Sequence, residues 1–493
     1  MRDNRKLKVI DYPLVLTREE TLNKKPILLI HSFLGKELFE LEEPWEIQTF
    51  KMIDGSNNCN TIIETITNSY RNVEKQQVKE LLKELESYGV ITSKRINPLK
   101  ITKSGNANDV HKAFLDYLRI SGLTNLKFPL RVRILLTLRC NMNCIYCYLR
   151  SGKIYRQKSK DELTFDQIKK IIDEMVQNNA YILDLSGGEP FLRNDAIDII
   201  KYASDRIPFI YILTNGSFLA NIDFVKSLSK TIKNKAVIIQ ISLDSSDPES
   251  SKRVKDALTF QKVLQGIKNA TQNNLLVNVN TVVTKSNFHD LDKIVTLSHK
   301  LGVKSHTFSE FIPVTCTKET IKEYLCSPAE YYRLQNEIVP RLQKKYPDML
   351  IIGKIIEPEF WDDIRKKTPK SPTYGSCAAF TTDLTIGPDG RVLPCAWFAA
   401  FPKFYGPDVT NSSIKEIWEN NTFVKKFRNI KIKGKCEKCE FNQLCYKGCF
   451  ALKYSIYKKL DIPDLKCWYI PGNPSSKKIP TNISDIMLGD GKF

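Results

Sequence analysis

Three cysteines constrain this chain most: Cys140, Cys144 and Cys147 directly follow an apolar stretch in the segment LLTLRCNMNCIYCY. The spacing C-x3-C-x2-C supplies three thiolates from one short loop. A four-iron cluster requires four ligands, so three thiolates leave one iron open for another group. A zinc site or scattered buried thiols are the alternative, but structural zinc needs a fourth protein ligand and usually has paired C-x2-C ligands.

The cysteine loop resembles the signature of radical SAM enzymes, and Tyr146, the aromatic residue just before the last cysteine, fits that family too. The resemblance implies a [4Fe–4S] cluster held by Cys140, Cys144 and Cys147. It also implies that the methionine end of S-adenosylmethionine (SAM) fills the open position on the cluster, with Tyr146 among the residues around SAM.

The length of 493 residues allows about two to four domains with proper cores. No window approaches the roughly 18 to 20 unbroken apolar residues of a membrane span. The opening MRDNRKLKVIDYP lacks an apolar stretch of the signal-peptide type, so we expect a cytoplasmic protein that does not enter a membrane. The cytosol keeps thiols reduced, and 13 cysteines therefore indicate metal or redox chemistry.

The net charge of +20 is unevenly distributed, because residues 1–100 contribute +1 and the remainder +19. Most of the lysines are dispersed on polar helix faces, which favours a solvated basic surface. The other interpretation is a basic channel for an acidic peptide or for an electron-donor protein of the flavodoxin or ferredoxin type. Nucleic acid is the less favoured partner.

An N-terminal domain is predicted over residues 1–95. The expected elements are strands over 9–16 and 26–34, helices over 62–70 and 77–90, and a closing strand over 90–93. They amount to three strands followed by a winged-helix-like trio. The simplest interpretation is a small α+β domain packed on the rest of the chain.

The same pattern resembles the PqqD-like peptide-recognition domain that is fused to many peptide-modifying enzymes. In that family a leader peptide adds a strand beside the third strand, against the last helix. Strand addition gives affinity through edge hydrogen bonds and selectivity through side-chain pockets. The resemblance therefore implies that a precursor peptide binds here.

From residue 130 onward, strands alternate with helices, which is typical of an α/β fold with a parallel sheet and right-handed crossovers. The predicted strands are 131–138, 181–187, 209–215, 236–244, 276–283 and 303–311. Six such units suit the partial (β/α)6 TIM-like barrel of radical SAM enzymes, in which chemistry occurs at the C-terminal ends of the strands. The predicted segments are a connector with an amphipathic helix (96–129), the barrel (130–315), a helical bridge (316–376), a cysteine-rich iron–sulfur domain (377–470) and a polar tail (471–493).

The second predicted strand ends in Gly187, Gly188, Glu189 and Pro190. The two glycines allow a close approach of backbone to a ligand, and the carboxylate can pair with an ammonium group. By resemblance, this motif holds the methionine amino group of SAM. A tight turn from strand to helix is the alternative.

Polar residues end the fourth predicted strand and lie within the fifth. Alternation along a strand places Ser242 and Asp244 on one side, where they suit the ribose hydroxyls of SAM as in the family. Asp244 could equally cap the following helix. Asn278 and Asn280 also share a side of their strand, and we expect Asn280 to contact SAM unless this pair faces solvent.

The C-terminal part contains seven cysteines: Cys377, Cys395, Cys436, Cys439, Cys445, Cys449 and Cys467. They match the pattern of SPASM domains, which carry two auxiliary iron–sulfur clusters, expected to be [4Fe–4S]. A zinc ribbon would need four or eight ligands. By resemblance, the cysteines divide into one complete set of four (Cys436, Cys439, Cys445 and Cys467) and one set of three nearer the barrel (Cys377, Cys395 and Cys449).

The set of three lacks a fourth cysteine close in sequence. Cys326 or Cys316 could fold back to complete it. Alternatively, an open iron could bind a substrate thiol and remove its proton. The open iron is a feature of thioether-forming maturases, which the chain resembles. Cys59 is expected to be a buried small residue.

These motifs together predict a radical SAM maturase of a ribosomally made precursor peptide. The resemblance implies a 5′-deoxyadenosyl radical that takes hydrogen from the peptide, and a thioether between a cysteine sulfur and a carbon as the product. Carbon–carbon crosslinking, epimerisation and formylglycine-type oxidation by the same machinery are rivals. A more distant alternative is a non-catalytic protein that binds peptides or nucleic acids. No general base is identified.

Overall fold

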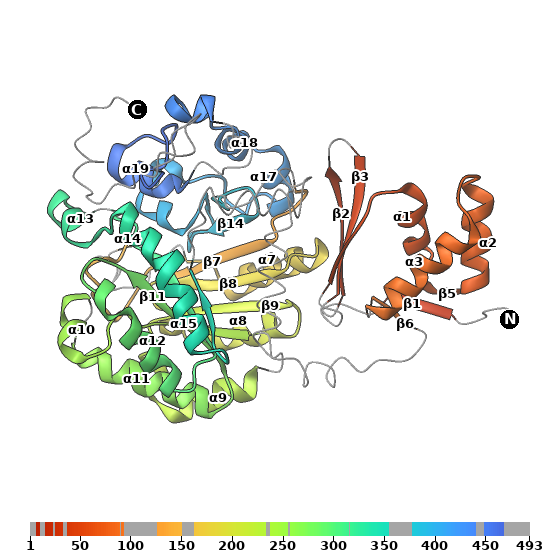
Figure 1. The fold of residues 1–493 in the computed structure, drawn as a ribbon. Coiled ribbons are helices and arrows are strands. Elements are labelled where there is room, and N and C mark those ends of the chain that lie inside the picture. The colour runs from red at the N-terminus through yellow and green to blue at the C-terminus, as the bar shows by residue number, and fades with distance from the viewer. Residues whose placement is uncertain are drawn as a thin grey trace.

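The structure is a computed structural model, and it describes residues 6–9, 15–22, 25–32, 37–88, 90–92, 126–149, 162–232, 237–254, 257–314, 316–353, 377–439 and 448–467 (Figure 1). The amphipathic helix predicted in the connector, the polar tail and Cys445 lie outside these residues. Among the described helices, none has the length and apolar character needed to cross a bilayer.

A nine-stranded sheet forms the centre of the molecule, in the order β13-β12-β11-β10-β9-β8-β7-β14-β15. Its parallel strands are β7 (Arg131–Thr137), β8 (Ile182–Gly187), β9 (Phe209–Thr214), β10 (Val237–Ser242), β11 (Leu276–Val283), β12 (Ser305–Glu310), β13 (Leu350–Ile352) and β14 (Asp383–Ile386). The strands β7 to β12 confirm the six predicted strands, and their parallel pairing confirms the predicted barrel. Strand β13 was not predicted, because three apolar residues are too short a run to identify a strand.

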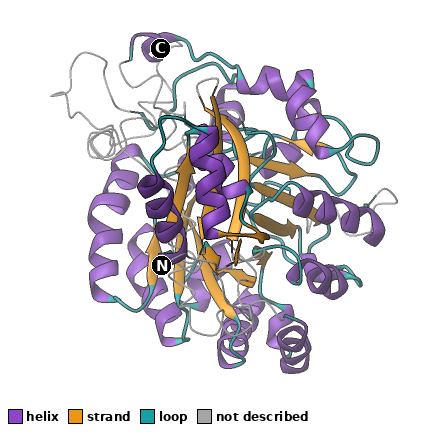
Figure 2. Cartoon of the chain, turned by 90° about the vertical axis from the view of Figure 1, so that its right-hand side faces the viewer, coloured by secondary structure: helices purple, strands orange, loops and turns teal. Residues whose placement is uncertain are grey.

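Helices surround the strands (Figure 2). They include α7 (Phe165–Gln177), α8 (Ala196–Ser204), α9 (Ile222–Thr231), α10 (Pro248–Val254), α11 (Ala257–Gln272) and α12 (Leu291–Lys300), and in the bridge α13 (Lys318–Tyr324), α14 (Pro328–Arg333) and α15 (Val339–Lys345). Helix α7 illustrates how the sequence builds this layer. Thr164 and Gln167 form a capping box at its start, and the buried Ile168, Ile171 and Met175 follow the helical period toward the sheet.

The C-terminal region extends the sheet of the barrel, which was not predicted. Strand β14 pairs in parallel with β7, with Asp383 opposite Arg131 and Ile386 opposite Ile134. Strand β15 (Val392–Leu393) then pairs antiparallel with β14. The helices α17 (Ile414–Asn420), α18 (Thr422–Arg428) and α19 (Phe450–Tyr457) lie on this side of the sheet (Figure 1).

Two large, separate apolar cores stabilise the described chain, beside a small third cluster that includes Leu135, Leu149 and Leu393. One runs without a break from Leu126 in front of the barrel to Tyr454 in α19. The fully buried Trp418 belongs to it, and its indole N–H donates to the carbonyl oxygen of Leu126 (2.5 Å). The other core consists of residues between Leu28 and Ile91. The barrel and the C-terminal region are thus one packing unit, and the N-terminal region is another.

The N-terminal region contains two small sheets and three helices. The elements are β1 (Lys6–Val9), β2 (Val15–Leu22), β3 (Lys25–Ser32), β4 (Glu37–Leu41), α1 (Pro44–Lys51), β5 (Asp54–Asn58), α2 (Cys59–Ser69), α3 (Lys75–Ser87) and β6 (Ile91–Thr92). The sheets have the orders β2-β3-β4 and β5-β1-β6. The single strand predicted over 9–16 is wrong, because β1 ends at Val9 and β2 begins at Val15. Cys59 is buried, as expected.

A buried ionic cluster connects the first two strands of the barrel. The carboxylate of Asp184 on β8 is completely buried and accepts hydrogen bonds from Arg131 Nε (2.9 Å) and Arg133 Nη2 (2.6 Å) on β7. Burial alone would raise the pKa of Asp184, but the two guanidinium groups outweigh burial and hold the pKa below its ordinary value. The charge of Asp184 is therefore part of the folded state.

We expect Asp184→Asn to lower the free energy of unfolding by about 3–5 kcal/mol, because it removes the buried carboxylate to which two partly buried guanidinium groups are paired. The contribution is present above the ordinary aspartate pKa of about 3.9 and is lost as the pH falls below it, since the folded-state pKa is depressed. Denaturant titration of both proteins at pH 7 and pH 3.5 measures the difference.

Asp166→Asn is the matched control, because Asp166 is exposed and pairs only with Lys169 on the surface of α7. This variant should lose no more than about 1 kcal/mol. Equal losses in the two variants would contradict a special role of the buried cluster.

Candidate functional site

The cysteine loop lies at the C-terminal end of β7, where the barrel fold predicts chemistry. Cys140, Cys144 and Cys147 are all partly buried and none forms a disulfide. Cys140 Sγ accepts a hydrogen bond from the backbone N–H of Met142 (3.4 Å), and Nδ2 of Asn215 is 3.8 Å away. Burial raises the pKa of the Cys140 thiol to about 11. The thiol is therefore protonated at neutral pH until a metal displaces the proton.

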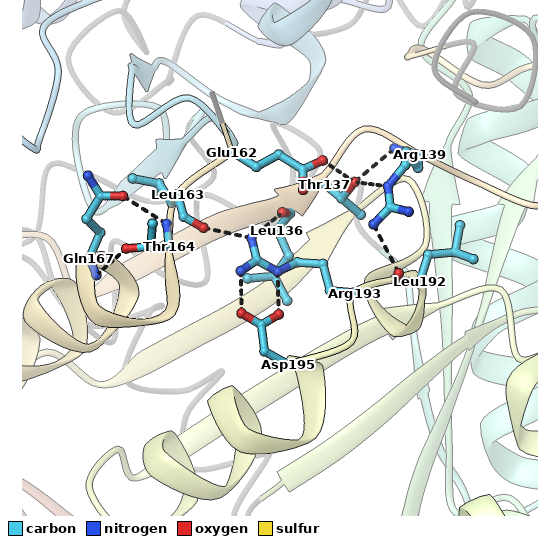
Figure 3. Close-up of polar contacts among 10 residues, drawn as sticks. All are labelled: Leu136, Thr137, Arg139, Glu162, Leu163, Thr164, Gln167, Leu192, Arg193 and Asp195. Carbon is cyan, nitrogen blue, oxygen red and sulfur yellow. Dashed lines mark hydrogen bonds and ion pairs between the residues drawn. The ribbon is translucent and has the colours of Figure 1, made fainter. Parts of the chain in front are cut away.

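An arginine fixes the backbone from which the loop starts (Figure 3). Arg193 donates to the carbonyl oxygens of Leu136 on β7 (3.1 Å) and of Leu163 (2.9 Å). Its other nitrogens form a two-pronged ion pair with Asp195 (2.8 and 2.6 Å). No motif marks Arg193 in the sequence, because its partners are backbone carbonyls distant in sequence.

A second group of contacts holds the three residues that precede Cys140 (Figure 3). The Thr137 hydroxyl donates to Glu162 (2.6 Å) and accepts from the backbone N–H of Arg139 (3.1 Å). The Arg139 side chain donates to the carbonyl oxygen of Leu192 (3.0 Å). The entrance of the cysteine loop is therefore tied to its surroundings on several sides.

Gly187 and Gly188 let the cysteine loop approach β8. A Cβ atom at Gly187 would lie 2.1 Å from the carbonyl oxygen of Thr137, and one at Gly188 would lie 2.0 Å from that of Arg139. Both distances are far below any possible contact. The backbone N–H groups of Gly188 and Glu189 donate to these same two oxygens, each at 2.7 Å. The group that lies close to these glycines is therefore the backbone of the cysteine loop. A contact of the glycines with SAM stays a prediction.

Glu189 is completely buried next to the cysteine loop. Its carboxylate accepts from the Thr214 hydroxyl (2.8 Å), from the backbone N–H of Asn215 (2.8 Å) and from that of Phe191 (3.2 Å). The charge of Glu189 adds to the raised pKa of Cys140. The carboxylate is thus oriented by its donors and near a cysteine, with Pro190 beginning the short turn that follows it.

Asp244 connects the cysteine loop to strand β11. It accepts a hydrogen bond from the Tyr146 hydroxyl and another from the backbone N–H of Val282 (2.7 Å). Burial, and then the charge of Asp244, raise the pKa of Tyr146 well above its ordinary value. The following helix is capped by a different residue, Asp247, which accepts from Glu249 N (2.9 Å). The alternative of Asp244 as a helix cap is therefore wrong.

A row of polar side chains crosses the inner face of the barrel. Ser242 and Asn280 are neighbours in the register of β10 and β11. Asn280 and Asn278 are both buried, so the alternative that they face solvent is wrong. Asn280 accepts from Ser309 (2.6 Å), whereas Asn278 donates to Gln240 on β10 (3.2 Å).

Three C-terminal cysteines converge beside the barrel. Burial raises the pKa of Cys395 well above its ordinary value, and the charges of Cys377 and Cys449 add to the effect. The start of α19 faces two of these thiols, because Cys377 accepts from the backbone N–H of Phe450 and Cys449 accepts from that of Leu452 (3.4 Å). We call Cys377, Cys395 and Cys449 the inner set.

Three further cysteines gather farther from the barrel. Burial raises the pKa of Cys436 to about 11, and the charges of Cys467 and Cys439 act in the same direction. We call Cys436, Cys439 and Cys467 the outer set. Its predicted fourth member, Cys445, lies outside the described residues. In the part of the chain that the structure describes, no three His, Cys, Asp or Glu side chains converge on one point, as a single metal ion requires. The thiolates of a four-iron cluster bind separate irons, so the sets fit a cluster rather than a mononuclear site.

Both candidates for a fourth inner ligand have contacts within the helical bridge or next to it. Cys316 Sγ donates to the carbonyl oxygen of Val314 (3.6 Å). Cys326 is completely buried in the helical bridge, where burial and then Glu330 raise its pKa. A fourth cysteine ligand from the bridge therefore stays a prediction.

The cysteine loop and the inner set are close to each other, which the sequence did not reveal. The ring of Tyr148 lies 6.3 Å from that of Trp397, two residues beyond Cys395. Burial raises the pKa of Tyr148, Arg133 acts against this, and the thiols of both Cys147 and Cys395 add to it. One aromatic side chain is thus within electrostatic range of both groups of thiols.

We expect Gly188→Ala to displace the cysteine loop, because its Cβ would occupy the position of the Arg139 carbonyl oxygen. Anaerobically reconstituted protein should fall from about twelve irons to about eight, as in the triple variant Cys140→Ala/Cys144→Ala/Cys147→Ala. Gly302→Ala is the control: Gly302, unlike Gly188, has a positive φ, but its Cβ would meet only Thr271, at 3.5 Å. That variant should retain about twelve irons. Full iron loading of Gly188→Ala would contradict the packing argument.

Comparisons with known proteins agree with this geometry. Residues 134–297 match the radical SAM superfamily, and residues 377–440 match SPASM, an iron–sulfur cluster-binding domain. The AdoMet-dependent heme synthase of Methanosarcina barkeri is 27% identical over 68% of this chain and 95% of its own length. The mycofactocin maturase MftC of Mycolicibacterium smegmatis is 24% identical over 72% of this chain and 87% of its own.

The fold is also similar to that of a solved structure. Streptococcus suis SuiB bound to its precursor peptide SuiA superimposes with a TM-score of 0.66, at 18% identity, over 94% of this chain and 100% of that chain. The two matched domains imply SAM and [4Fe–4S] clusters, including auxiliary clusters, as the cofactors, and the three groups of thiols described above fit them. The chain therefore combines a radical SAM domain with a SPASM iron–sulfur cluster-binding domain.

Proposed function

We propose that the chain modifies a ribosomally made precursor peptide by forming a thioether between a cysteine sulfur and a carbon of that peptide. The observation that carries the proposal is the inner set: three partly buried thiols that pack against the same core as Cys140 and Cys144 of the cysteine loop. A cluster held by three thiolates has an iron available for a substrate thiolate.

The relatives support a peptide as the substrate. They include MftC and the antilisterial bacteriocin subtilosin biosynthesis protein AlbA of Bacillus subtilis, which is 25% identical over 68% of this chain and 71% of its own length. SuiB, with the same fold over nearly the whole chain, has been solved with its precursor peptide.

The residues of the barrel would hold SAM between the cysteine loop and the inner polar row. Glu189, oriented by Thr214 and Asn215, would receive the ammonium group of SAM. Ser242 and Asn280 would face the ribose hydroxyls. Tyr146, held by Asp244, would close the site on the side of the loop.

Bound SAM supplies a radical that can take one hydrogen atom from a peptide carbon. The protein contributes orientation and the exclusion of water. Forming the sulfur–carbon bond removes two hydrogens from the peptide, because the carbon loses a hydrogen atom and the thiol loses a proton. The inner set, whose thiols are partly buried, would hold a cluster that can take up the electron that remains. A flavodoxin-type or ferredoxin-type protein would reduce the cysteine loop's cluster.

The N-terminal region would bind the leader part of the precursor. Its sheet β2-β3-β4 ends in β4, the third strand of that sheet in chain order, and β4 pairs with β3 alone among the described strands. An extended leader could add to this edge through backbone hydrogen bonds. The separate core of the region is consistent with an independent recognition module.

A carbon–carbon crosslink is the rival within this machinery. The PqqA peptide cyclase of Bradyrhizobium diazoefficiens is 27% identical over 66% of this chain. Both products lack two hydrogens, so mass alone does not separate them. The reactivity of the substrate cysteine does.

Mass spectrometry of the modified precursor tests the thioether. We expect a loss of two hydrogens, about 2 Da, and one cysteine that iodoacetamide no longer alkylates. Cys395→Ser should abolish this product while SAM is still cleaved, because the cysteine loop is unchanged. Cys316→Ser, which removes a candidate fourth ligand of the inner set, should leave the product unchanged, because the proposal gives that position to the substrate thiol. A loss of two hydrogens with every cysteine still alkylated would exclude the thioether.

Turnover of the precursor without its leader tests the N-terminal region. We expect the core peptide alone to be modified at least about tenfold more slowly, because about 1.4 kcal/mol of binding energy corresponds to that factor. Leader peptide added as a separate molecule should restore part of the rate. A leader of the same composition in scrambled order serves as the control. Equal rates with and without leader would contradict peptide recognition by this region.

A further inference from the structure

A completely buried lysine lies next to the inner set. Lys453 is in the second turn of α19, the helix that begins directly after Cys449. No part of the lysine is exposed. Removing an ammonium group from water is unfavourable by several kcal/mol unless other charges and hydrogen bonds compensate. Burial lowers the pKa of Lys453, and the negative charge of Asp464, followed by those of the surrounding thiols, opposes this effect.

The two ends of Lys453 connect the inner set to the outer set. Its backbone N–H donates to the carbonyl oxygen of Cys449 (3.1 Å). Its Nζ donates to the carbonyl oxygen of Ile462 (3.0 Å) and lies 4.3 Å from the centre of the Phe450 ring. Ile462 is in the segment that leads to Cys467 of the outer set.

That segment is itself fastened to both sets. Asp464 accepts a hydrogen bond from the backbone N–H of Cys449 (2.8 Å), and its own carbonyl oxygen accepts from the N–H of Cys467 (3.1 Å). Gly448 has no room for a side chain, because a Cβ there would lie 1.7 Å from Asp464. The position of the lysine ammonium relative to both sets is therefore fixed by the backbone.

The charge of Lys453 acts on thiols of both sets. Burial raises the pKa of Cys377 in the inner set and of Cys436 in the outer set, and the lysine charge opposes this effect at both. Cys449 is a further electrostatic neighbour of Lys453. One cation thus interacts with cysteines of two predicted clusters.

We propose that Lys453 is a positioning residue that raises the reduction potentials of both auxiliary clusters through one shared, buried positive charge. Reduction adds a negative charge to a cluster, and a nearby cation in a medium of low dielectric constant stabilises the reduced form. An electron left by the reaction would then be accepted more readily by either cluster. The inference rests on the two auxiliary clusters and is independent of which bond the enzyme forms.

The test is a redox titration, followed by electron paramagnetic resonance, of protein that carries the auxiliary clusters alone. The background Cys140→Ala/Cys144→Ala/Cys147→Ala removes the SAM cluster and its signal. In this background, Lys453→Met keeps the volume of the side chain and removes its charge, whereas Lys453→Arg keeps the charge. Lys458→Met is the matched control, because Lys458 follows the same helix but is exposed.

We expect Lys453→Met to shift the reduction equilibrium of both clusters at least tenfold toward the oxidised form, which is about 59 mV for a one-electron couple. Lys453→Arg should keep both reduction potentials close to those of the background protein. Lys458→Met should shift the reduction equilibrium less than threefold, because water screens an exposed charge. Unchanged potentials, or a shift of a single cluster, would overturn the shared role.

Cluster loading keeps the test decisive. If Lys453→Met binds fewer than about eight irons, Lys453→Gln, which retains a donor for the Ile462 carbonyl, is titrated in its place. Failure of both neutral variants to bind iron would assign the lysine to cluster assembly and would overturn the redox role. No peptide enters these measurements, so their failure leaves the proposed thioether chemistry standing, and failure of the peptide assay leaves Lys453 unaffected.

Discussion

The pairing of β7 with strands on both of its edges is the constraint on which the rest of the structure depends. One edge bonds to β8, whose end bears the two glycines and Glu189. The other edge bonds to β14, which belongs to the cysteine-rich region. The C-terminal end of β7 leads into the cysteine loop. A single strand therefore fixes the loop relative to both of its neighbours, and the apolar core that runs from the barrel into α19 makes the arrangement rigid.

Burial explains why this site needs so many exact contacts. Thr137, Glu162, Glu189 and Asp244 are polar or charged, and each is at least nine-tenths buried. Groups of this kind are stable in an interior only when they are hydrogen-bonded. Their partners here are the backbone and side chains of the cysteine loop and of the neighbouring strands. The same contacts that satisfy the buried groups also hold the three thiols in place.

The sequence predicted those parts of the molecule that depend on local pattern. Apolar runs between helical segments were enough to locate β7 to β12, whereas the grouping of the C-terminal thiols came from the resemblance to SPASM domains and stays a prediction. Contacts between distant segments were not accessible. The sequence gives no sign that Asp247 and not Asp244 caps α10, since both aspartates precede that helix. Strand β14 was missed because its four residues form a strand only when they pair with β7.

The division of the molecule into two apolar cores has a consequence for its evolution. A region with its own core can be exchanged by recombination without disturbing the packing of its neighbour. The N-terminal region meets that condition, and under its proposed role in leader binding its replacement would supply a new substrate. The barrel and the cysteine-rich region share a sheet and a core, so they can only be inherited together. New substrates should therefore arise by changes at the N-terminus far more readily than new arrangements of the clusters.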